Sequence, residues 1–351
     1  MKTLIEQQAP YEIPAFPSTR FMGSKRRLLD FISQVASQLD YETVLDAFSG
    51  SGCVSFLFKS LGKEVTSNDF LAYSYHIANA TVANNNTTAS ADQVDFLLSK
   101  NKAAGDFIQQ TFNGLFFTPA DNAFLDNISA NIPLLSSSYE KSLAIAALCR
   151  AALKKQPRGV FTVIGHRYDD GRRDFRLSMR DQFINSISEY NAAVFDNNRK
   201  NQAFKGDIFQ REPVDYDLVY IDPPYYSPHS DNDYIRRYHF IEGLATYWTG
   251  VKIKEGSRTQ RLEKRDTPFC SRARCYEAFD QLFAKFPNSK LLVSYSSNSL
   301  PTREEMIDIM KKHRRHVEVF EYDHKYSFGN HNHKVGNNRN SVQEYLFLGH
   351  S

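Results

Sequence analysis

A short apolar segment that ends in an acid and runs into spaced glycines limits most strongly what this chain can fold into. The segment TVLDAF covers residues 43–48, SGSG follows at 49–52, and residues 53–61 have apolar residues at helical spacing. Residues 64–68 form a second predicted strand, which ends at Asp69, and residues 70–83 again have helical spacing. Strand, tight turn, helix, strand and helix in this order predict an α/β unit around a parallel sheet.

This alternation stops after residue 85 and returns near residue 201. Residues 91–104 and 139–155 have helical spacing, whereas YDLVYI at 216–221 and KLLVSY at 290–295 are apolar enough for buried strands. A helix is predicted at 303–315, and the β-rich segments 317–322 and 342–348 are close enough in sequence to pair antiparallel. A chain of 351 residues exceeds one comfortable core. We therefore predict one domain from 1–85 and 201–351, and a second, mainly helical domain inserted at 86–200.

Composition excludes several classes of protein. The chain is 41% hydrophobic, but its best apolar run, 143–149, is far shorter than the ~18 residues of a membrane span. The first residues lack the apolar core of a signal peptide, so we expect a cytoplasmic protein without membrane contact. Four cysteines are too few for a disulfide framework, and neither they nor His331 and His333 have the spacing of a zinc site. We expect no metal.

The formal net charge of +3 says little, but two stretches concentrate basic residues. Residues 150–180 contain nine Lys or Arg and three acids, and residues 252–274 contain eight and three. Either stretch alone is as often a solvated surface, but two of them on a nearly neutral chain predict binding of a polyanion.

The glycine segment predicts a site for a nucleoside-containing cofactor. Glycines between a strand and a helix let the backbone approach a ligand at the helix N-terminus. Ser55 breaks the dinucleotide pattern G-x-G-x-x-G, and the phosphate-binding pattern of ATPases is absent from the sequence. The second strand ends at Asn68 and Asp69, and an acid there can accept hydrogen bonds from ribose hydroxyls. A helix cap with a solvated acid is the alternative.

The sequence Asp222-Pro223-Pro224-Tyr225 follows the predicted strand 216–221. Two prolines fix the backbone of the turn and remove two N–H donors, which leaves carbonyl groups to accept. A carboxylate, a proline carbonyl and an aromatic ring in one rigid turn can hold an exocyclic amino group and stack on its base. A turn that contains Asp and Tyr by accident is the alternative.

Four sequence blocks, in the order in which they follow one another along the chain, resemble those of the Dam-like (D12 class, alpha group) DNA adenine-N6 methyltransferases. They are RFMGSK at 20–25, DAFSGSG at 46–52, Asn68-Asp69, and the DPPY sequence at 222–225. Residues 158–175 also resemble that family's glycine-containing recognition hairpin. The resemblance covers residues 20–85 and 205–250 clearly and 290–348 more loosely; the rest of the insertion departs from it, which leaves the target sequence open.

The resemblance implies a Rossmann-like sheet for S-adenosylmethionine-dependent methyl transfer, with an antiparallel C-terminal strand. S-adenosylmethionine is the implied cofactor and double-stranded DNA the implied partner, whose target adenine is flipped out of the helix for transfer to N6. Asp222, Pro223, Pro224 and Tyr225 are the implied catalytic group, and the ring of Tyr225 is expected to stack on the base. The cofactor-binding residues are expected to be Phe21, Gly23, Lys25, Asp46, Phe48, Ser49, Gly50, Gly52, Asn68, Asp69 and, if it is more than a loop acid, Asp207.

We expect most target reading in residues 150–180, with a two-stranded ribbon in the major groove and DNA contacts from Arg158, Arg167, Arg172, Arg173 and Arg176. The enzyme is expected to be an orphan methylase or to protect DNA from a cognate restriction endonuclease encoded separately. Three alternatives stay open: an RNA adenine-N6 methyltransferase, a DNA cytosine-N4 methyltransferase, and a DNA-binding module without catalysis. The tryptophan, Trp248, is expected to lie in the core.

Overall fold

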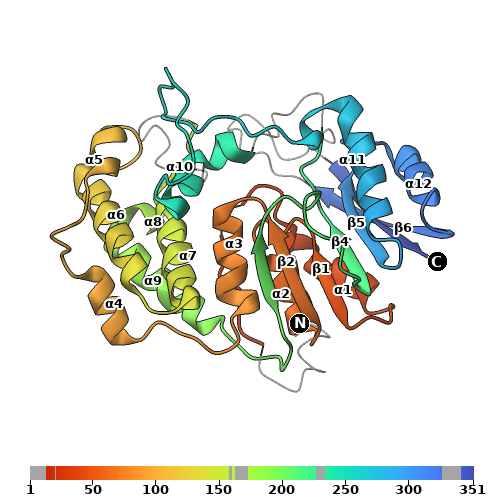
Figure 1. The fold of residues 1–351 in the computed structure, drawn as a ribbon, viewed down its shortest axis with the longest axis horizontal. Coiled ribbons are helices and arrows are strands. Elements are labelled where there is room, and N and C mark those ends of the chain that lie inside the picture. The colour runs from red at the N-terminus through yellow and green to blue at the C-terminus, as the bar shows by residue number, and fades with distance from the viewer. Residues whose placement is uncertain (1–12, 20, 158–159, 163–172, 227–233, 326–340) are drawn as a thin grey trace. The chain divides into compact units, whose positions relative to one another are not determined.

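The structure is a computed structural model that describes residues 13–19, 21–157, 160–162, 173–226, 234–325 and 341–351. Its strands form a seven-stranded sheet in the order β3-β2-β1-β4-β5-β7-β6 (Figure 1). β2 pairs with β3, β1 with β4 and β4 with β5 in parallel, whereas β7 is antiparallel to β5 and β6. The strands are Thr43–Asp46 (β1), Glu64–Asp69 (β2), Gln202–Lys205 (β3), Leu218–Ile221 (β4), Lys290–Ser296 (β5), His316–Lys325 (β6) and Ser341–His350 (β7). The predicted mixed sheet with an antiparallel C-terminal part is confirmed.

The chain divides into two compact units. The first comprises the described residues within 1–27, 49–207 and 233–265, and the second those within 28–48, 208–232 and 266–351. Each has its own apolar core. The division into a catalytic domain at 1–85 and 201–351 and an inserted recognition domain at 86–200 remains a prediction, because compactness does not say which residues read DNA.

The first unit consists of β2, β3 and most of the helices. Helix α3 lies against β2, α7 packs against both α3 and α9, and α10 contacts α3 and α7 (Figure 1). The helices are α2 (Cys53–Ser60), α3 (Ala72–Ala78), α4 (Ala91–Leu98), α5 (Phe107–Thr111), α6 (Pro119–Asn131), α7 (Ser138–Lys154), α8 (Arg173–Arg176), α9 (Met179–Ala192) and α10 (Tyr234–Thr246), with a π-helical turn at Asn79–Ala83 and a 3-10 turn at Ile132–Leu134.

The second unit places two helices side by side next to the antiparallel strands. Helices α11 (Arg272–Lys285) and α12 (Arg303–Lys311) pack against each other, and α12 also contacts β6 and β7 (Figure 1). Helix α1 (Leu29–Ala36) precedes β1, and a 3-10 turn at Pro268–Cys270 precedes α11. Another 3-10 turn, Lys25–Leu28, leads into α1.

Several helices begin at capping residues that the sequence displays. Ser137 accepts from the first turn of α7 while Glu140 reaches back to the backbone of Ser137, and Thr302 and Glu305 do the same for α12. Helix α4 has a similar box but ends at Leu98, whereas helical spacing predicted 91–104, because the backbone is already extended at Ser99. Strand β3 was not predicted: its four residues, QAFK, are mostly exposed and carry no apolar pattern.

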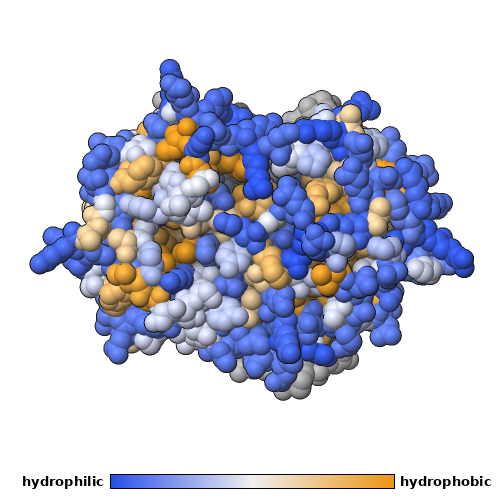
Figure 2. All heavy atoms as spheres, in the orientation of Figure 1, coloured by the Kyte–Doolittle hydropathy of each residue, from blue (hydrophilic) through white to orange (hydrophobic). Residues whose placement is uncertain are grey.

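The surface is mixed. Figure 2 shows a face that is mostly hydrophilic, on which apolar atoms gather only in small groups. Among the described residues, no helix combines the length and apolar character needed to cross a membrane.

Trp248 lies in the core of the first unit as predicted, against Phe112 and Phe240, and its indole occupies the space that a Cβ at Gly243 would need.

Candidate active site

Two backbone N–H groups fasten the glycine loop of the first unit to the end of β2, and a third closes the loop on itself. The N–H of Ser49 donates to the carbonyl of Asn68 at 2.9 Å, and the N–H of Gly50 donates to the Asp69 carboxylate at 2.8 Å. The N–H of Gly52 closes a turn onto Ser49 at 2.7 Å. Gly50 and Gly52 have φ of +49° and +77°, which side chains other than glycine rarely tolerate. Both positions therefore favour glycine, and the prediction that these glycines bind a cofactor stays a prediction.

The N-terminal block covers this loop. A Cβ on Gly50 would lie 3.2 Å from the ring of Phe21, so the ring packs directly over the glycine. Phe21 in turn stacks on Tyr238 of α10, with ring centroids 5.1 Å apart, and the N–H of Met22 donates to the Tyr238 hydroxyl at 2.6 Å. Tyr238 is where α10 kinks, with φ −108° and ψ 16°. Sequence reasoning missed Tyr238, which lies more than two hundred residues from Phe21.

The rest of the block approaches the same loop. Ser24 and Ser51 share a hydrogen bond between their hydroxyls at 3.1 Å, which joins the block to the glycine turn. Gly23 has φ of +73°, and a Cβ there would come within 2.9 Å of the Tyr234 hydroxyl. Lys25 is buried, and its ammonium donates to the carbonyl of Gly23 at 3.2 Å. Phe21, Gly23 and Lys25 are therefore brought together with Ser49, Gly50 and Gly52.

Asp207 follows β3, beside the end of β2. The two strands are parallel, with Asp69 opposite Lys205, so their carboxyl ends share one edge. The N–H of Gly206 donates to the carbonyl of Asp69 at 2.9 Å, and the Asn68 amide donates to the carbonyl of Gly206 at 3.3 Å. The side chain of Asn68 thus fixes the turn that carries Asp207. These contacts bring Asp207 to the edge where Asp69 lies.

Asp69 is an electrostatically unusual carboxylate. Burial is the main cause that raises its pKa from 3.8 to about 6; the N–H groups of Leu71 and Gly50 stabilise its charge and oppose this rise, and the charge of nearby Glu242 adds to it. Glu242, on α10, accepts the N–H groups of Ala72 and Tyr73 at the start of α3, and burial raises its pKa as well. Sequence reasoning missed Glu242, because a helix N-terminus that is capped by a residue of another helix leaves no local pattern.

In the second unit, β1 and β4 bring two acids to one edge. The strands are parallel neighbours with Asp46 opposite Tyr220, and the N–H of Ala47 donates to the carbonyl of Tyr220 at 3.0 Å. Asp46 ends β1 and Asp222 directly follows β4. The strand order reverses between β1 and β4, and ligands of open α/β sheets bind at such switch points. Phe48 packs edge-on against Phe269, with ring centroids 5.6 Å apart.

The DPPY turn is held together by its own tyrosine. The Tyr225 hydroxyl donates to a carboxylate oxygen of Asp222 at 2.8 Å, and it lies 3.4 Å from the carbonyl of Ser294 on β5. The Tyr225 ring packs edge-on against Tyr295, with centroids 4.6 Å apart, and Pro223 is buried. From the sequence, the ring of Tyr225 is expected to stack on the base, and this stays a prediction. The hydroxyl, however, orients the carboxylate of Asp222.

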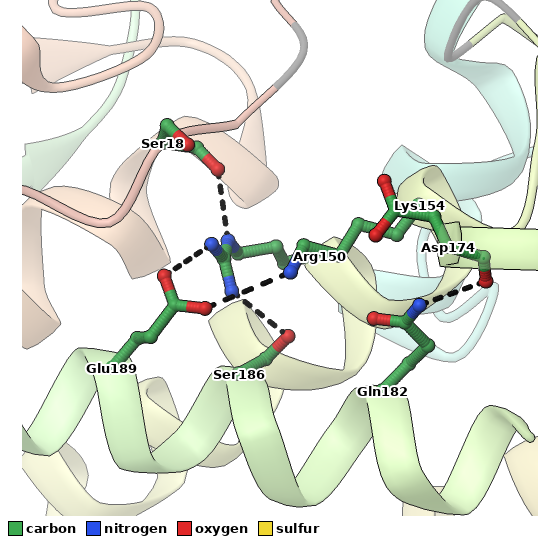
Figure 3. Close-up of polar contacts among 7 residues, drawn as sticks. All are labelled: Ser18, Arg150, Lys154, Asp174, Gln182, Ser186 and Glu189. Atoms are coloured by element: carbon green, nitrogen blue, oxygen red, sulfur yellow. Dashed lines mark hydrogen bonds and ion pairs between the residues drawn. The ribbon is translucent and has the colours of Figure 1, made fainter. Parts of the chain in front are cut away.

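The first basic stretch is only partly available to a ligand. Arg150 of α7 is 2% exposed; its guanidinium donates to the carbonyl of Ser18 at 2.9 Å and to the Ser186 hydroxyl at 3.2 Å, and it pairs with Glu189 (Figure 3). Lys154 also pairs with Glu189, at 3.6 Å (Figure 3). Arg150 and Lys154 are two of the cations that the sequence suggested for binding a polyanion. They instead hold α7 against α9, and Arg150 also holds the N-terminal segment.

The structure describes two of the five arginines that are predicted to contact DNA. Arg173 and Arg176 are exposed in the short helix α8, whereas Arg158, Arg167 and Arg172 lie outside the described residues. The predicted two-stranded ribbon is not present in the described part of the stretch, residues 160–162 and 173–180. Phe161, whose β-favouring neighbourhood suggested that ribbon, is instead stacked on Phe240 in the core, with centroids 4.9 Å apart.

Across the described residues, no group of three or more His, Cys, Asp or Glu is arranged to hold a metal ion. His331 and His333 lie outside those residues, so the absence of a metal remains a prediction. The first unit instead assembles the glycine loop beside the carboxylate of Asp69, and the second unit holds the carboxylate of Asp222 with the hydroxyl of Tyr225.

Comparison with known proteins identifies the family. Residues 21–285 match the profile of the D12 class N6 adenine-specific DNA methyltransferases, which is most of the chain. The chain belongs to this family. The predicted family and activity are thereby confirmed.

Relatives of this adenine methyltransferase include enzymes of restriction-modification systems. It is 30% identical to the type II methyltransferase M2.HphI of Haemophilus parahaemolyticus over 328 residues, which cover 89% of the chain and 93% of that protein. It is 27% identical to the type II methyltransferase M.FokI of Planomicrobium okeanokoites and 26% identical to the modification methylase LlaI of Lactococcus lactis subsp. lactis. The matches with M.FokI and LlaI cover 84% of this chain but only 47% and 48% of those longer proteins.

Proposed function

We propose that this methyltransferase transfers a methyl group from S-adenosylmethionine to N6 of one adenine that is flipped out of a specific site in duplex DNA. The hydrogen bond from the Tyr225 hydroxyl to Asp222 at the end of β4 is the observation that carries this proposal. It fixes an acceptor carboxylate in a rigid proline turn at the sheet's switch point, where an exocyclic amine can be held.

The first unit supplies a cradle that fits the cofactor. Gly23 and Gly50 have positive φ, and Tyr234 and Phe21 pack so closely against them that a larger residue would not fit, which holds the glycine loop and the N-terminal block together in one compact cradle. The carboxylate of Asp69 is a suitable acceptor for ribose hydroxyls, and Asp207 lies at the same edge of β2 and β3. We assign Lys25, Asp46, Phe48, Ser49, Gly52 and Asn68 to the same function.

When bound, S-adenosylmethionine supplies a methyl group on a positively charged sulfur. The adenine amine is a poor nucleophile, because its lone pair is delocalised into the ring. Asp222 and the carbonyl of Pro223 would accept its N–H bonds and so favour a pyramidal nitrogen whose lone pair is available. Pro224 keeps the turn rigid. Proton loss can follow the transfer, so Asp222 need not act as a full general base.

Tyr225 would then have two functions. Its ring would stack on the flipped base, for which base–aromatic stacking typically contributes about 1–3 kcal/mol. Its hydroxyl would keep Asp222 oriented toward the amine. Target reading is assigned to residues 150–180, where Arg173 and Arg176 are exposed, together with Arg158, Arg167 and Arg172.

The names of the relatives favour a biological setting. M2.HphI and M.FokI are type II methyltransferases and LlaI is a modification methylase. We propose that this enzyme likewise modifies DNA, either beside a restriction endonuclease encoded separately or as an orphan methylase, in the cytoplasm and without a metal.

Incubation of the protein with S-adenosylmethionine and an unmethylated plasmid, followed by long-read sequencing for modified bases, tests the function. We expect N6-methyladenine at every copy of one short sequence and at no other adenine. Methylation of cytosine, scattered methylation without a site, or binding of DNA without any modification would each overturn the proposal.

A further inference from the structure

Three arginines converge on a small pocket in the first unit that the catalytic proposal does not use. The pocket has a volume of about 220 Å³. Arg236 comes from α10, and Arg258 and Arg261 come from the segment that follows it. The hydroxyl-bearing residues Thr162, Ser257 and Thr259 complete most of the lining.

A hairpin holds two of the arginines in place. Ile253 and Leu262 form an antiparallel bridge, and the N–H of Lys254 donates to the carbonyl of Arg261 at 2.8 Å. At the tip, Gly256 has φ of +68°, and the N–H of Arg261 donates to the Ser257 hydroxyl at 3.0 Å. These bonds present Arg258, Arg261 and Ser257 together from one turn, so the lining is set by backbone geometry.

Helix α10 and the segment at Phe161 form the opposite part of the lining. The N–H of Phe161 donates to the carbonyl of Arg237 at 3.1 Å, and the carbonyl of Phe161 bonds the His239 imidazole at 2.7 Å. Thr162 is thereby held beside Arg236. Burial is the main cause that lowers the pKa of His239 to about 4; the hydrogen bond to Phe161 opposes this shift and the charge of Arg261 adds to it, so this imidazole is neutral at pH 7. Arg261 therefore faces α10.

The described lining of this pocket is basic. None of the described residues that line it is an acid. Within the part of the chain that the structure describes, no ion pair joins Arg258 or Arg261 to a carboxylate, whereas Arg274, further along the sequence, is paired with Asp266 at 2.6 Å. Guanidinium groups brought together repel one another, and an oxyanion with several acceptors relieves that repulsion through charge-assisted hydrogen bonds.

We propose that this pocket binds one phosphate of the DNA backbone, a step that rests on duplex DNA being the substrate. Thr162 comes from the first basic stretch and both hairpin arginines come from the second, so the pocket joins the two stretches in one site. A phosphate contact sets the register of the duplex without reading its sequence. Helix α10 carries both Arg236 and Tyr238, and Tyr238 contacts Phe21 and Met22. A phosphate bound at Arg236 would therefore contact the same helix that supports the N-terminal block proposed to bind the cofactor.

Single changes of Arg258 and Arg261 to Ala test the site, with Lys254→Ala as the matched control. Lys254 lies on the same hairpin, is exposed and does not line the pocket. Affinities are measured at several salt concentrations for a duplex with the methylated site and for one with that site scrambled. We expect each arginine change to weaken both duplexes equally and to reduce the salt slope by about one unit, while the control keeps the wild-type slope.

The charge-keeping variants Arg258→Lys and Arg261→Lys should retain the salt slope but bind more weakly, because a lysine cannot make the bidentate contact. An unchanged slope in the Ala variants, a loss limited to the methylated site, or an equal effect of Lys254→Ala would overturn the proposal. Tighter binding of single-stranded RNA than of duplex DNA, lost in the same variants, would also overturn it. Failure of the proposed function is distinct, since the wild-type protein would then not methylate DNA.

Discussion

The carboxylate of Asp69 should make cofactor binding depend on pH near neutrality. Both of its oxygens already accept backbone N–H groups, from Leu71 at 2.9 Å and Gly50 at 2.8 Å, so the carboxylate is fixed where a ribose would lie. An ionised carboxylate is a much better acceptor for hydroxyl groups than a protonated one. Because its pKa is about 6, the acid is about nine-tenths ionised at pH 7 and about one-tenth ionised at pH 5.

If only the ionised form accepts the ribose hydroxyls, the Kd for S-adenosylmethionine should rise about tenfold as the pH falls from 7 to 5. Half of the Asp69 carboxylates are protonated near pH 6. Isothermal titration calorimetry on the free enzyme, without DNA, measures this directly. Asp69→Asn should bind more weakly at pH 7 and should lose most of the pH dependence. Glu242→Gln should move the midpoint to lower pH, since the charge of Glu242 raises the pKa of Asp69.

The same group affects stability, and the sign is opposite to that of an ordinary paired acid. The pKa is higher in the folded state than in the unfolded state, so the folded protein binds more protons between about pH 4 and pH 6. Stability should therefore fall as pH rises through this range and level off above it. A rise from 3.8 to about 6 corresponds to about 3 kcal/mol.

Asp69→Asn removes the cost of burying the ionised carboxylate. One of the two backbone N–H groups then faces the NH2 group of the new side chain and loses its acceptor, which typically costs about 1–3 kcal/mol. We therefore expect the variant to be nearly as stable as the wild type at pH 7 and less stable at pH 5, as measured by urea unfolding. A cofactor Kd that is constant from pH 5 to pH 7 in the wild-type enzyme would refute the assignment of Asp69 to the ribose.

Substitutions at three other positions, together with one control variant, test the remaining assignments. Asp222→Ala should reduce methyl transfer by about 100-fold or more while calorimetry finds the cofactor Kd unchanged; activity within about tenfold of the wild type would rule out its role at the amine. Tyr225→Phe should lower kcat by about tenfold because the hydroxyl orients Asp222, and Tyr225→Ala should be worse; equal activity of the Phe variant would mean that only the ring matters. Arg150→Met should cost about 2 kcal/mol in thermal unfolding and raise the cofactor KM more than it lowers kcat, because Ser18 leads into the cofactor block. Lys154→Met, which loses only a half-exposed ion pair with Glu189, is its control and should change stability little.

The parts of the fold that were predicted correctly have local causes. The strand at 43–46, the glycine turn and the helix after it follow from a buried apolar run and from backbone angles that favour glycine. The turn at Asp222 follows a continuous apolar strand, and two prolines allow few conformations. The antiparallel C-terminal pair was predictable because its strands lie close in sequence.

What the sequence did not reveal depends on contacts between distant segments. Tyr238 holds Phe21 and Glu242 caps α3, and both come from α10, whose function is not marked by any short motif. Arg150 looked like part of a basic surface, but its charge is buried between α7 and α9. Counting charges along a sequence cannot separate a cation that faces solvent from one that joins two helices.

Transfer to N6 of adenine through Asp222 can be followed with S-adenosylmethionine that carries an isotopically labelled methyl group. DNA is incubated with the wild-type enzyme or with Asp222→Ala, digested to nucleosides and analysed by mass spectrometry. We predict label in N6-methyladenine alone with the wild-type enzyme, and label reduced by about 100-fold or more with the variant, which still binds the cofactor. Label in N4-methylcytosine, or the same amount of labelled adenine from both proteins, would contradict it.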